Sequence, residues 1–318
     1  MIDHRFRVFI FGGLTPTSLI PLQLNTLLSL LHLLTALFAM TTALEVTLRT
    51  DLDKRKKTTM PIPDLLRPAP TTAPDFFSSD YLSVTTSQVV RDAFLRGLSS
   101  APRILGSGGS RLGTGNTEAY TRIEERLSGF FGSAPGARAS AALLFNSGYD
   151  ANRVFWSTVP QKGDAIVFDD LVHISMKDGM SQSRAGALYP FEHNSVVAFR
   201  KRVGEALAAH PNIAEGKGTL FVAVETLYSM DGDFAALRDI FDAADELIPA
   251  GCAHLMVDEA HTTGLFGPDG RGLLFELGLE GRVNTVLHTF SKAWGLSGGM
   301  SSLRCYMMEI NTSWTNQV

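Results

Sequence analysis

The sequence is poor in cysteine and has no excess of basic residues. Cys252 and Cys305 are the only cysteines in 318 residues, so we expect neither a disulfide framework nor a paired-cysteine metal site. This low cysteine content is typical of a protein from a reducing compartment. The net charge of −4 is unlike that of a nucleic-acid-binding domain, which needs a basic surface. The 45% of hydrophobic residues is typical of a globular protein with a buried core. We therefore predict a cytoplasmic protein with no nucleic-acid partner and no metal site.

A long N-terminal stretch lacks charge altogether. Residues 8–44 contain no Asp, Glu, Lys or Arg, and residues 26–44 are long enough to span a bilayer as a helix. Under the positive-inside rule, the basic residues of segment 51–57 would then keep the rest of the chain in the cytosol. Pro21 and several polar residues interrupt the apolar run. The open interpretations are a membrane anchor within residues 18–44, a targeting segment, and an extension that packs or stays disordered.

Composition divides the chain into four parts. Residues 58–75 are rich in proline and threonine, which predicts a linker or an arm lying over the surface. The predicted parts are an apolar N-terminal extension (1–48), an arm and linker (49–105), a large domain (106–300) and a divergent tail (301–318).

Short apolar runs alternate with helical patterns through the predicted large domain. The spacing of apolar residues predicts a helix capped by Asn116 and another over residues 234–248. The predicted strands cover residues 141–145, 165–168, 220–224, 254–257 and 283–287. This alternation is typical of an α/β fold with a mostly parallel sheet and flanking helices. Polar residues follow the strand ends, which is where open α/β sheets bind ligands.

A lysine lies just after the last of these strands. Lys292 ends the segment TFSK, and three glycines come within the next seven residues. A lysine among small residues at a strand end can be desolvated, which lowers the pKa of its amine and makes the amine nucleophilic. Taken alone, the segment is more typical of a surface lysine in a glycine loop.

A carboxylate and a histidine follow the preceding strand. In the segment VDEAH, Asp258 and His261 are three residues apart and can address two atoms of one ring. An Asp so placed can keep the nitrogen of a pyridine ring protonated. A structural histidine at an acidic strand end fits the pattern equally well. DEAH is also a helicase box, but a helicase needs a G-x-x-x-x-G-K-[ST] phosphate loop, which this sequence lacks.

Four further motifs are ambiguous when each is taken alone. The glycine-rich segment 106–115 exposes backbone to a phosphate or to a second chain, but it is not a dinucleotide-binding fingerprint. Residues 147–149 join a strand to a helix, whose N-terminus attracts anions. His173 follows the second strand, and segment 225–233 follows the third. Their plain interpretations are a flexible loop, a strand-to-helix turn, a structural histidine and a turn.

Taken in order, these motifs resemble the α-oxoamine synthases, which are fold-type-I pyridoxal-phosphate enzymes. The order is GSGGSR, FNSGY, a histidine, YSMDGD, VDEAH and T-x-S-K. The resemblance runs from about Leu44 to about Gly299 and includes the segment FSSDYL at residues 77–82. Within the family, the letters GSRL are more similar to the 8-amino-7-oxononanoate synthase branch than to the branches that use glycine. The implied fold is the large domain of a fold-type-I transferase.

The resemblance implies three catalytic residues. Lys292 would attach pyridoxal phosphate covalently and remove a proton from the substrate. Asp258 would pair with the pyridine nitrogen, and His173 would stack on the face of the ring.

The resemblance also implies a wider set of residues that contact the cofactor. His261 and Ser229 would address its phenolic oxygen, Gly148, Tyr149 and Thr289 would bind its phosphate, and Glu225 would lie near its ring. Residues 108–111 would lie near a dimer interface, since the family builds its site from two subunits.

The implied reaction is a decarboxylative condensation of an amino acid, expected to be L-alanine, with an acyl-CoA. Coenzyme A and carbon dioxide would be released, as in biotin-type biosynthesis, and the enzyme would be a homodimer. The family continues past the lysine into a small C-terminal domain, whereas residues 301–318 do not resemble that continuation. The arginines that bind the substrate carboxylate in the family have no counterpart here. Two hypotheses stay open: an active acyltransferase, and a catalytically impaired cofactor-binding remnant or partner subunit.

Overall fold

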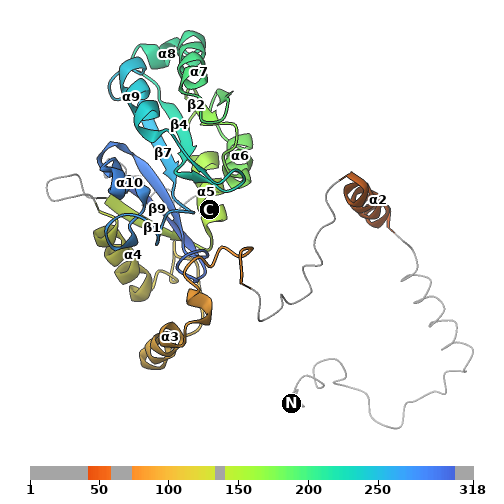
Figure 1. Cartoon of the computed structure of the whole chain (residues 1–318), viewed down its shortest axis with the longest axis vertical. Coiled ribbons are helices and arrows are strands. Elements are labelled where there is room, and N and C mark those ends of the chain that lie inside the picture. Colours follow the sequence, from red (N-terminus) through yellow and green to blue (C-terminus); the bar gives the residue numbers. More distant parts are fainter. Residues whose placement is uncertain (1–41, 59–73, 133–139, 305–318) are drawn as a thin grey trace, which may run out of the picture. The chain divides into compact units, whose positions relative to one another are not determined.

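The computed structural model describes residues 42–58, 74–132 and 140–304 (Figure 1). The chain divides into two compact units, Met1–Asp75 and Phe76–Val318. In the first unit the described element is helix α2 (Ala43–Thr58). Among the described residues, no helix is long and apolar enough to cross a membrane. The predicted anchor over residues 18–44 and the proline-rich linker lie almost entirely outside the described residues, so both stay predictions.

The second unit alternates strands and helices. Its elements, in chain order, are η2 (Val84–Thr86), α3 (Gln88–Ser100), α4 (Glu118–Phe130), β1 (Ser140–Phe145), α5 (Gly148–Thr158), β2 (Ala165–Asp169), α6 (Ile174–Ser181), β3 (Ala187–Phe191), α7 (Val196–Ala209), α8 (Pro211–Ala214), β4 (Leu220–Glu225), β5 (Leu227–Tyr228), β6 (Asp233–Phe234), α9 (Leu237–Leu247), β7 (Ala253–Asp258), η3 (Pro268–Gly270), α10 (Leu273–Leu277), η4 (Glu280–Arg282), β8 (Thr285–Thr289) and β9 (Gly299–Arg304).

Seven strands form one sheet in the order β1-β9-β8-β7-β4-β2-β3, and β5 pairs with β6 in a separate hairpin. Strands β8, β7, β4, β2 and β3 are parallel to their neighbours in this series, whereas β9 runs antiparallel to both β1 and β8. The prediction of an α/β fold with a mostly parallel sheet is therefore confirmed.

All five predicted strands are present, with small shifts. β8 lies two residues later than predicted, so that Thr289 ends the strand and does not follow it. The sequence pattern gave no indication of β3 or β9, and β9 extends four residues past residue 300. Two helix boundaries were wrong. Thr117 and not Asn116 is the N-cap of α4, and α9 begins at Leu237 because Phe234 belongs to β6.

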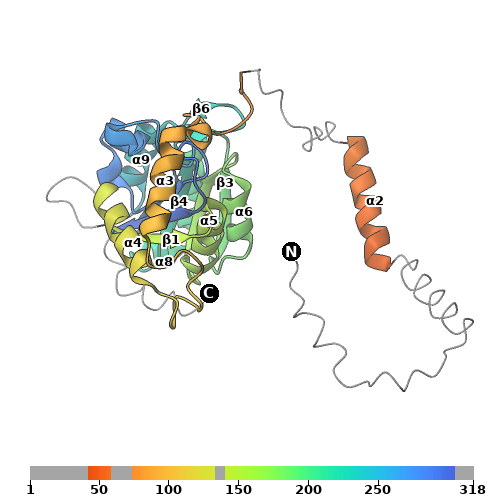
Figure 2. The same cartoon turned by 90° about the horizontal axis from the view of Figure 1, so that it is seen from below.

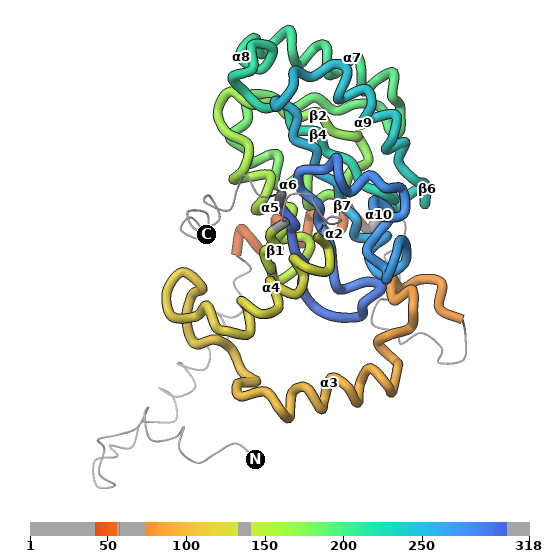
Figure 3. Tube along the Cα trace, turned by 90° about the vertical axis from the view of Figure 1, so that its left-hand side faces the viewer, coloured from red at the N-terminus to blue at the C-terminus, as the bar shows by residue number. Residues whose placement is uncertain are grey.

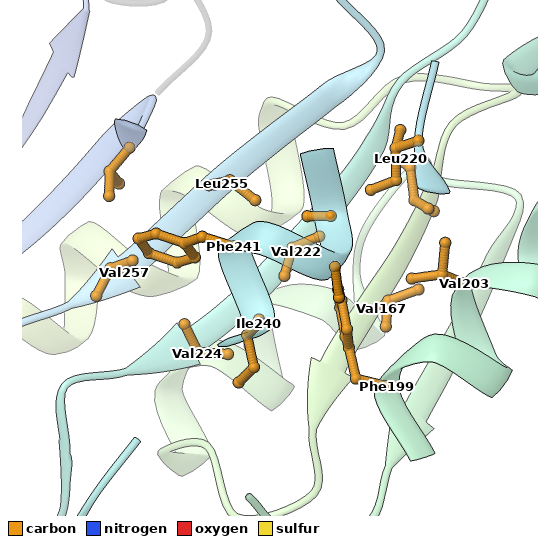
Figure 4. Close-up of a cluster of buried hydrophobic side chains, with 14 of the residues drawn as sticks. Val167, Phe199, Val203, Leu220, Val222, Val224, Ile240, Phe241, Leu255 and Val257 are labelled. Atoms are coloured by element: carbon orange, nitrogen blue, oxygen red, sulfur yellow. The ribbon is translucent and has the colours of Figure 1, made fainter. Parts of the chain in front are cut away.

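Helices cover both faces of the sheet, as the continuous burial of β4 requires. Side chains alternate along a strand, so Val222 and Val224 pack with α7 and α9, whereas Phe221 and Ala223 pack with α5 and α6. Figures 2 and 3 show these two helical layers on opposite sides of the central strands. Figure 4 shows the α7–α9 side, where aromatic and branched side chains face the valines of the strands.

Side chains of helix α4 accept hydrogen bonds from backbone N–H groups along the outer edge of strand β1. The backbone N–H of Leu144 donates to Glu124 Oε1 at 2.8 Å, and that of Ala142 donates to Ser128 Oγ at 2.8 Å. Arg111 from the glycine-rich segment forms two bonds of 2.7 Å with the Glu124 carboxylate. Pairing by side chains blocks this edge against association with another strand. The glycine-rich segment therefore connects to the edge of the sheet.

Helix α3 contains no buried residue. Val90, Phe94 and Leu98 are exposed and lie four residues apart, so they share one face of the helix. Figure 3 shows α3 along the outside of the second unit.

We predict that Phe241→Ala lowers the free energy of unfolding by about 3–5 kcal/mol, because it opens a cavity in a fully buried cluster. Urea denaturation followed by circular dichroism measures this loss. Val197→Ala on α7 is the control, since that side chain is 80% exposed and its loss should be near neutral. Equal losses in the two variants would contradict the assignment of Phe241 to the core.

Candidate active site

Three carboxyl groups lie at the carboxyl ends of neighbouring parallel strands. They are Asp169 on β2, Glu225 on β4 and Asp258 on β7, and all three are buried. The register pairs Glu225 with Asp258 directly across the two strands. Burial of several carboxyl groups is costly unless each has donors or keeps its proton, so the surroundings of each group reveal its state.

The Asp258 carboxyl group accepts two hydrogen bonds from described residues. The backbone N–H of Ala260 donates to Oδ1 at 2.8 Å, and the side-chain amide of Asn152 donates to Oδ2 at 2.8 Å. Both donors hold the carboxylate in one orientation at the end of β7.

Glu225 accepts a hydrogen bond from the backbone N–H of His173 through Oε1. Burial, followed by the nearby Asp258 carboxylate, raises the pKa of Glu225 to about 8. At neutral pH the Glu225 carboxyl group is therefore mostly protonated.

Lys292 lies beside His261, and this pair extends to a third residue. The Nζ amine donates to His261 Nε2 at 2.7 Å, and His261 Nδ1 lies 2.7 Å from the Tyr81 hydroxyl. Burial lowers the pKa of Lys292, although the Asp258 and Glu225 carboxyl groups oppose that shift. Burial, followed by the Lys292 charge, lowers the pKa of His261 to about 4. The amine is thus held near a neutral imidazole, in a setting that suits a nucleophilic lysine.

His173 is the N-cap of α6, because its Nδ1 accepts from the backbone N–H of Ser175 at 3.2 Å. Burial of the ring lowers the pKa of His173. The Tyr149 ring meets the His173 ring edge-on, with centroids 6.1 Å apart, and the Tyr149 hydroxyl donates to Asp178. Contacts on two sides therefore fix the imidazole plane.

Gly148 and Thr289 are in contact at the N-terminus of α5. A Cβ atom at Gly148 would lie 2.9 Å from the Cβ of Thr289, so a larger residue would push the two segments apart. Ser147 caps the helix by accepting from the backbone N–H of Asp150 at 3.0 Å. The Thr289 hydroxyl therefore lies beside the first residue of a helix, whose end attracts anions.

The structure gathers most of the predicted site residues and leaves one apart. Ser229 lies exposed in the turn after β5, and within the described ranges no hydrogen bond connects it to the other predicted residues. The residues that do meet, directly or through one neighbour, are Gly148, Tyr149, His173, Glu225, Asp258, His261, Thr289 and Lys292.

Three residues of the site were not singled out from the sequence. Asn152 and Ser175 are 2% exposed or less and hydrogen-bond each other at 3.0 Å, and Tyr81 approaches from the segment before η2. The sequence could have pointed to Asn152, because asparagine is unfavourable inside a helix. An asparagine on the apolar face of a helical pattern therefore needs a hydrogen-bond partner. The contact of Tyr81 spans 180 residues, and no local pattern indicates it.

Comparisons with known families and proteins agree with the family resemblance seen in the sequence. The profile of the family described as aminotransferase class I and II matches residues 75–317. An 8-amino-7-oxononanoate synthase from Emericella nidulans is 44% identical over 233 residues, which are 73% of this chain and 55% of that protein. The chain spans about half the length of the curated relatives it matches.

Two solved structures of serine palmitoyltransferases are also similar to this chain. Serine palmitoyltransferase from Sphingomonas wittichii matches with a TM-score of 0.62 and 33% identity, over 73% of this chain and 53% of that chain. A serine palmitoyltransferase from S. paucimobilis, solved with bound pyridoxal phosphate and myriocin, also has a TM-score of 0.62 and 33% identity, over 73% of this chain and 55% of that one.

We predict that Glu225→Gln flattens the pH dependence of stability. The raised pKa means that the folded chain keeps a proton that the unfolded chain releases between about pH 4.5 and 8. The free energy of unfolding therefore falls as the pH rises through this window. Glu259, whose pKa burial also raises to about 8, contributes in the same direction.

Urea denaturation at several pH values across that window measures the slope. Glu225→Gln should make it shallower, whereas Glu192→Gln, at an exposed position, should leave it unchanged. An unchanged slope in Glu225→Gln would show that this carboxyl group does not hold a proton in the folded state.

Proposed function

The chain belongs to the aminotransferase class I and II family, and on that premise we propose that it is the cofactor-binding part of an α-oxoamine synthase. The observation that carries the proposal is the position of Lys292. Its amine has a lowered pKa and lies at the edge of the sheet where Asp258, Glu225 and His173 meet. A nucleophilic amine beside a buried carboxylate is what covalent attachment of pyridoxal phosphate requires.

The residues present fit this cofactor at both of its ends. Gly148 leaves no room for a side chain against Thr289, and the adjoining helix N-terminus with the Thr289 hydroxyl suits a phosphate group. Asp258, at the end of β7, is held by two donors and is available to a protonated ring nitrogen. We therefore assign the phosphate to the first turn of α5 and the ring nitrogen to Asp258.

When bound, pyridoxal phosphate supplies an electron sink that stabilises negative charge on carbon α of an amino acid. The protein has to attach, orient and move protons. Lys292 can remove the proton from carbon α, because burial lowers the pKa of its amine and so favours the neutral form. His261 continues from Lys292 Nζ to the hydroxyl of Tyr81, an exposed residue, and this series provides a route for that proton toward solvent.

The substrates we propose are an amino acid and an acyl-CoA, with L-alanine as the first amino acid to test. The synthase relative supports an 8-amino-7-oxononanoate synthase-like reaction in biotin-type biosynthesis. The serine palmitoyltransferase neighbours make L-serine the competing choice. Coenzyme A and carbon dioxide would be the released products.

We further propose that the chain acts as a homodimer. The exposed apolar face of α3, with Val90, Phe94 and Leu98, supports an association surface on the second unit. The alternative is a cofactor-binding remnant or a partner subunit without turnover.

We predict that pyridoxal phosphate gives the purified chain a visible absorbance band that Lys292→Ala abolishes. Borohydride reduction followed by mass spectrometry should place the cofactor on the peptide that contains Lys292. Lys201→Ala is the control, since that side chain is 73% exposed on α7. Attachment to another lysine, or a band that survives in Lys292→Ala, would contradict the assignment.

We also predict that L-alanine changes this band more strongly than L-serine or glycine does. With an acyl-CoA present, free thiol should then accumulate at a rate that depends on Lys292. A thiol assay with each amino acid measures the reaction. A changed band without thiol release would favour the remnant or partner subunit, and a response to L-serine alone would replace L-alanine as the substrate.

A further inference from the structure

A continuous series of hydrogen bonds joins Asp258 to His173 through two buried side chains. Asn152 Nδ2 lies 2.8 Å from Asp258 Oδ2 and 3.0 Å from Ser175 Oγ, and Ser175 Oγ lies 2.7 Å from His173 Nδ1. Asn152 is 2% exposed and Ser175 is fully buried, so water does not compete for these bonds. The two residues come from α5 and α6, which pack against each other on one face of the sheet.

The direction of every bond in this series follows from chemistry. The Asn152 amide donates from Nδ2 to Asp258 Oδ2. Its second hydrogen points to Ser175 Oγ. Because the backbone N–H of Ser175 makes His173 Nδ1 an acceptor, the Ser175 hydroxyl, 2.7 Å from Nδ1, donates to it. The backbone N–H of Ser175 also donates to His173 Nδ1, at 3.2 Å, and a backbone N–H can only donate. Two donors on one nitrogen leave no place for a proton there.

We propose that Asn152 and Ser175 are positioning residues that hold Asp258 and fix His173 as the neutral tautomer with its proton on Nε2. The outer edge of the ring then presents an N–H donor to the ligand, and the inner edge remains an acceptor. This proposal rests on the proposed function only for the identity of that ligand. The tautomer itself is a property of the chain alone.

The charges around His173 agree with a neutral ring. Lys292 opposes protonation, as does the N-terminus of α6, which the ring caps. The groups that favour protonation are Asp258 on β7 and Asp178 on α6. Glu225 on β4 is mostly protonated at neutral pH, and Tyr149 contributes an uncharged ring. Burial of the His173 ring is the largest effect, and it lowers the pKa of His173.

Asn152 carries a structural sign of this role. Its Oδ1 atom is buried and has no hydrogen-bond partner in the described part of the chain. An unsatisfied buried acceptor is unfavourable, so a residue selected for stability alone would be apolar here. The amide is explained by its two donated bonds, one to Asp258 and one to Ser175, which connects in turn to His173.

The test is the ¹⁵N NMR spectrum of histidine-labelled chain without cofactor, with His173→Gln to assign the signals. We expect Nδ1 of His173 to have the chemical shift of an unprotonated nitrogen and Nε2 that of a protonated one between about pH 6 and 8. Ser175→Ala removes a donor to Nδ1 and should raise the pKa of His173. Ser181→Ala, on the same helix with its hydroxyl bonded to a backbone carbonyl, is the control. A protonated Nδ1, or equal titrations in wild type and Ser175→Ala, would overturn the proposal.

Cofactor binding provides the second measurement. Asn152→Leu removes a hydrogen bond to a charged group and should weaken pyridoxal phosphate binding by about 10- to 100-fold, with Ser181→Ala unchanged. Circular dichroism shows whether each variant folds. If Asn152→Leu does not fold, the Ser175→Ala variant still tests the proposal. If wild type binds no pyridoxal phosphate but shows the stated tautomer, the proposed function fails and the positioning pair stands. If the cofactor binds and the tautomer differs, the positioning pair fails alone.

Discussion

The arrangement of the site depends on three buried carboxyl groups at the ends of adjacent parallel strands. Three negative charges so close together in a dry interior would be strongly unfavourable, and the structure resolves them in three ways. Asp169 Oδ1 lies 2.8 Å from His193 Nδ1. Burial of the His193 imidazole opposes its protonation, but the hydrogen bonds to Asp169 and Asp233 outweigh burial and raise the pKa of His193. Glu225 keeps its proton. The Asp258 carboxyl group accepts from two fixed donors, the backbone N–H of Ala260 and the side-chain amide of Asn152.

Sequence patterns predicted the parts of this arrangement that arise within single segments. Buried apolar runs gave five strands, and the polar residues at their ends gave the place of the site, because parallel strands share one edge. The resemblance to α-oxoamine synthases is confirmed by relatives that carry synthase and palmitoyltransferase names. β3 was missed because Pro190 and alternating exposure weaken its pattern, and β9 because its residues MSSL are not uniformly apolar.

The remaining contacts join segments that are distant in sequence. Asn152 is 106 residues from Asp258, and Tyr81 is 180 residues from His261. Such pairs depend on how α5 packs on the sheet and on where the segment before η2 runs, and neither is encoded in local spacing. Ser229 shows the opposite case, since its motif is recognisable but it lies in an exposed turn, and among the described residues no hydrogen bond joins it to the other predicted site residues. Local motifs thus identified chemical groups, whereas packing decided which groups meet.

Glu225 and Lys292 illustrate how the protons of such a site depend on one another. An ionised Glu225 would favour the charged form of the Lys292 amine, because opposite charges stabilise each other. Burial and Asp258 keep Glu225 protonated up to about pH 8, so at neutral pH this support is largely withdrawn. The lysine then loses its proton more readily, and a neutral amine is the form that can act as a nucleophile or a base. A protonated Glu225 and a neutral Lys292 therefore favour each other, because each removes the charge that would stabilise the charged form of the other group.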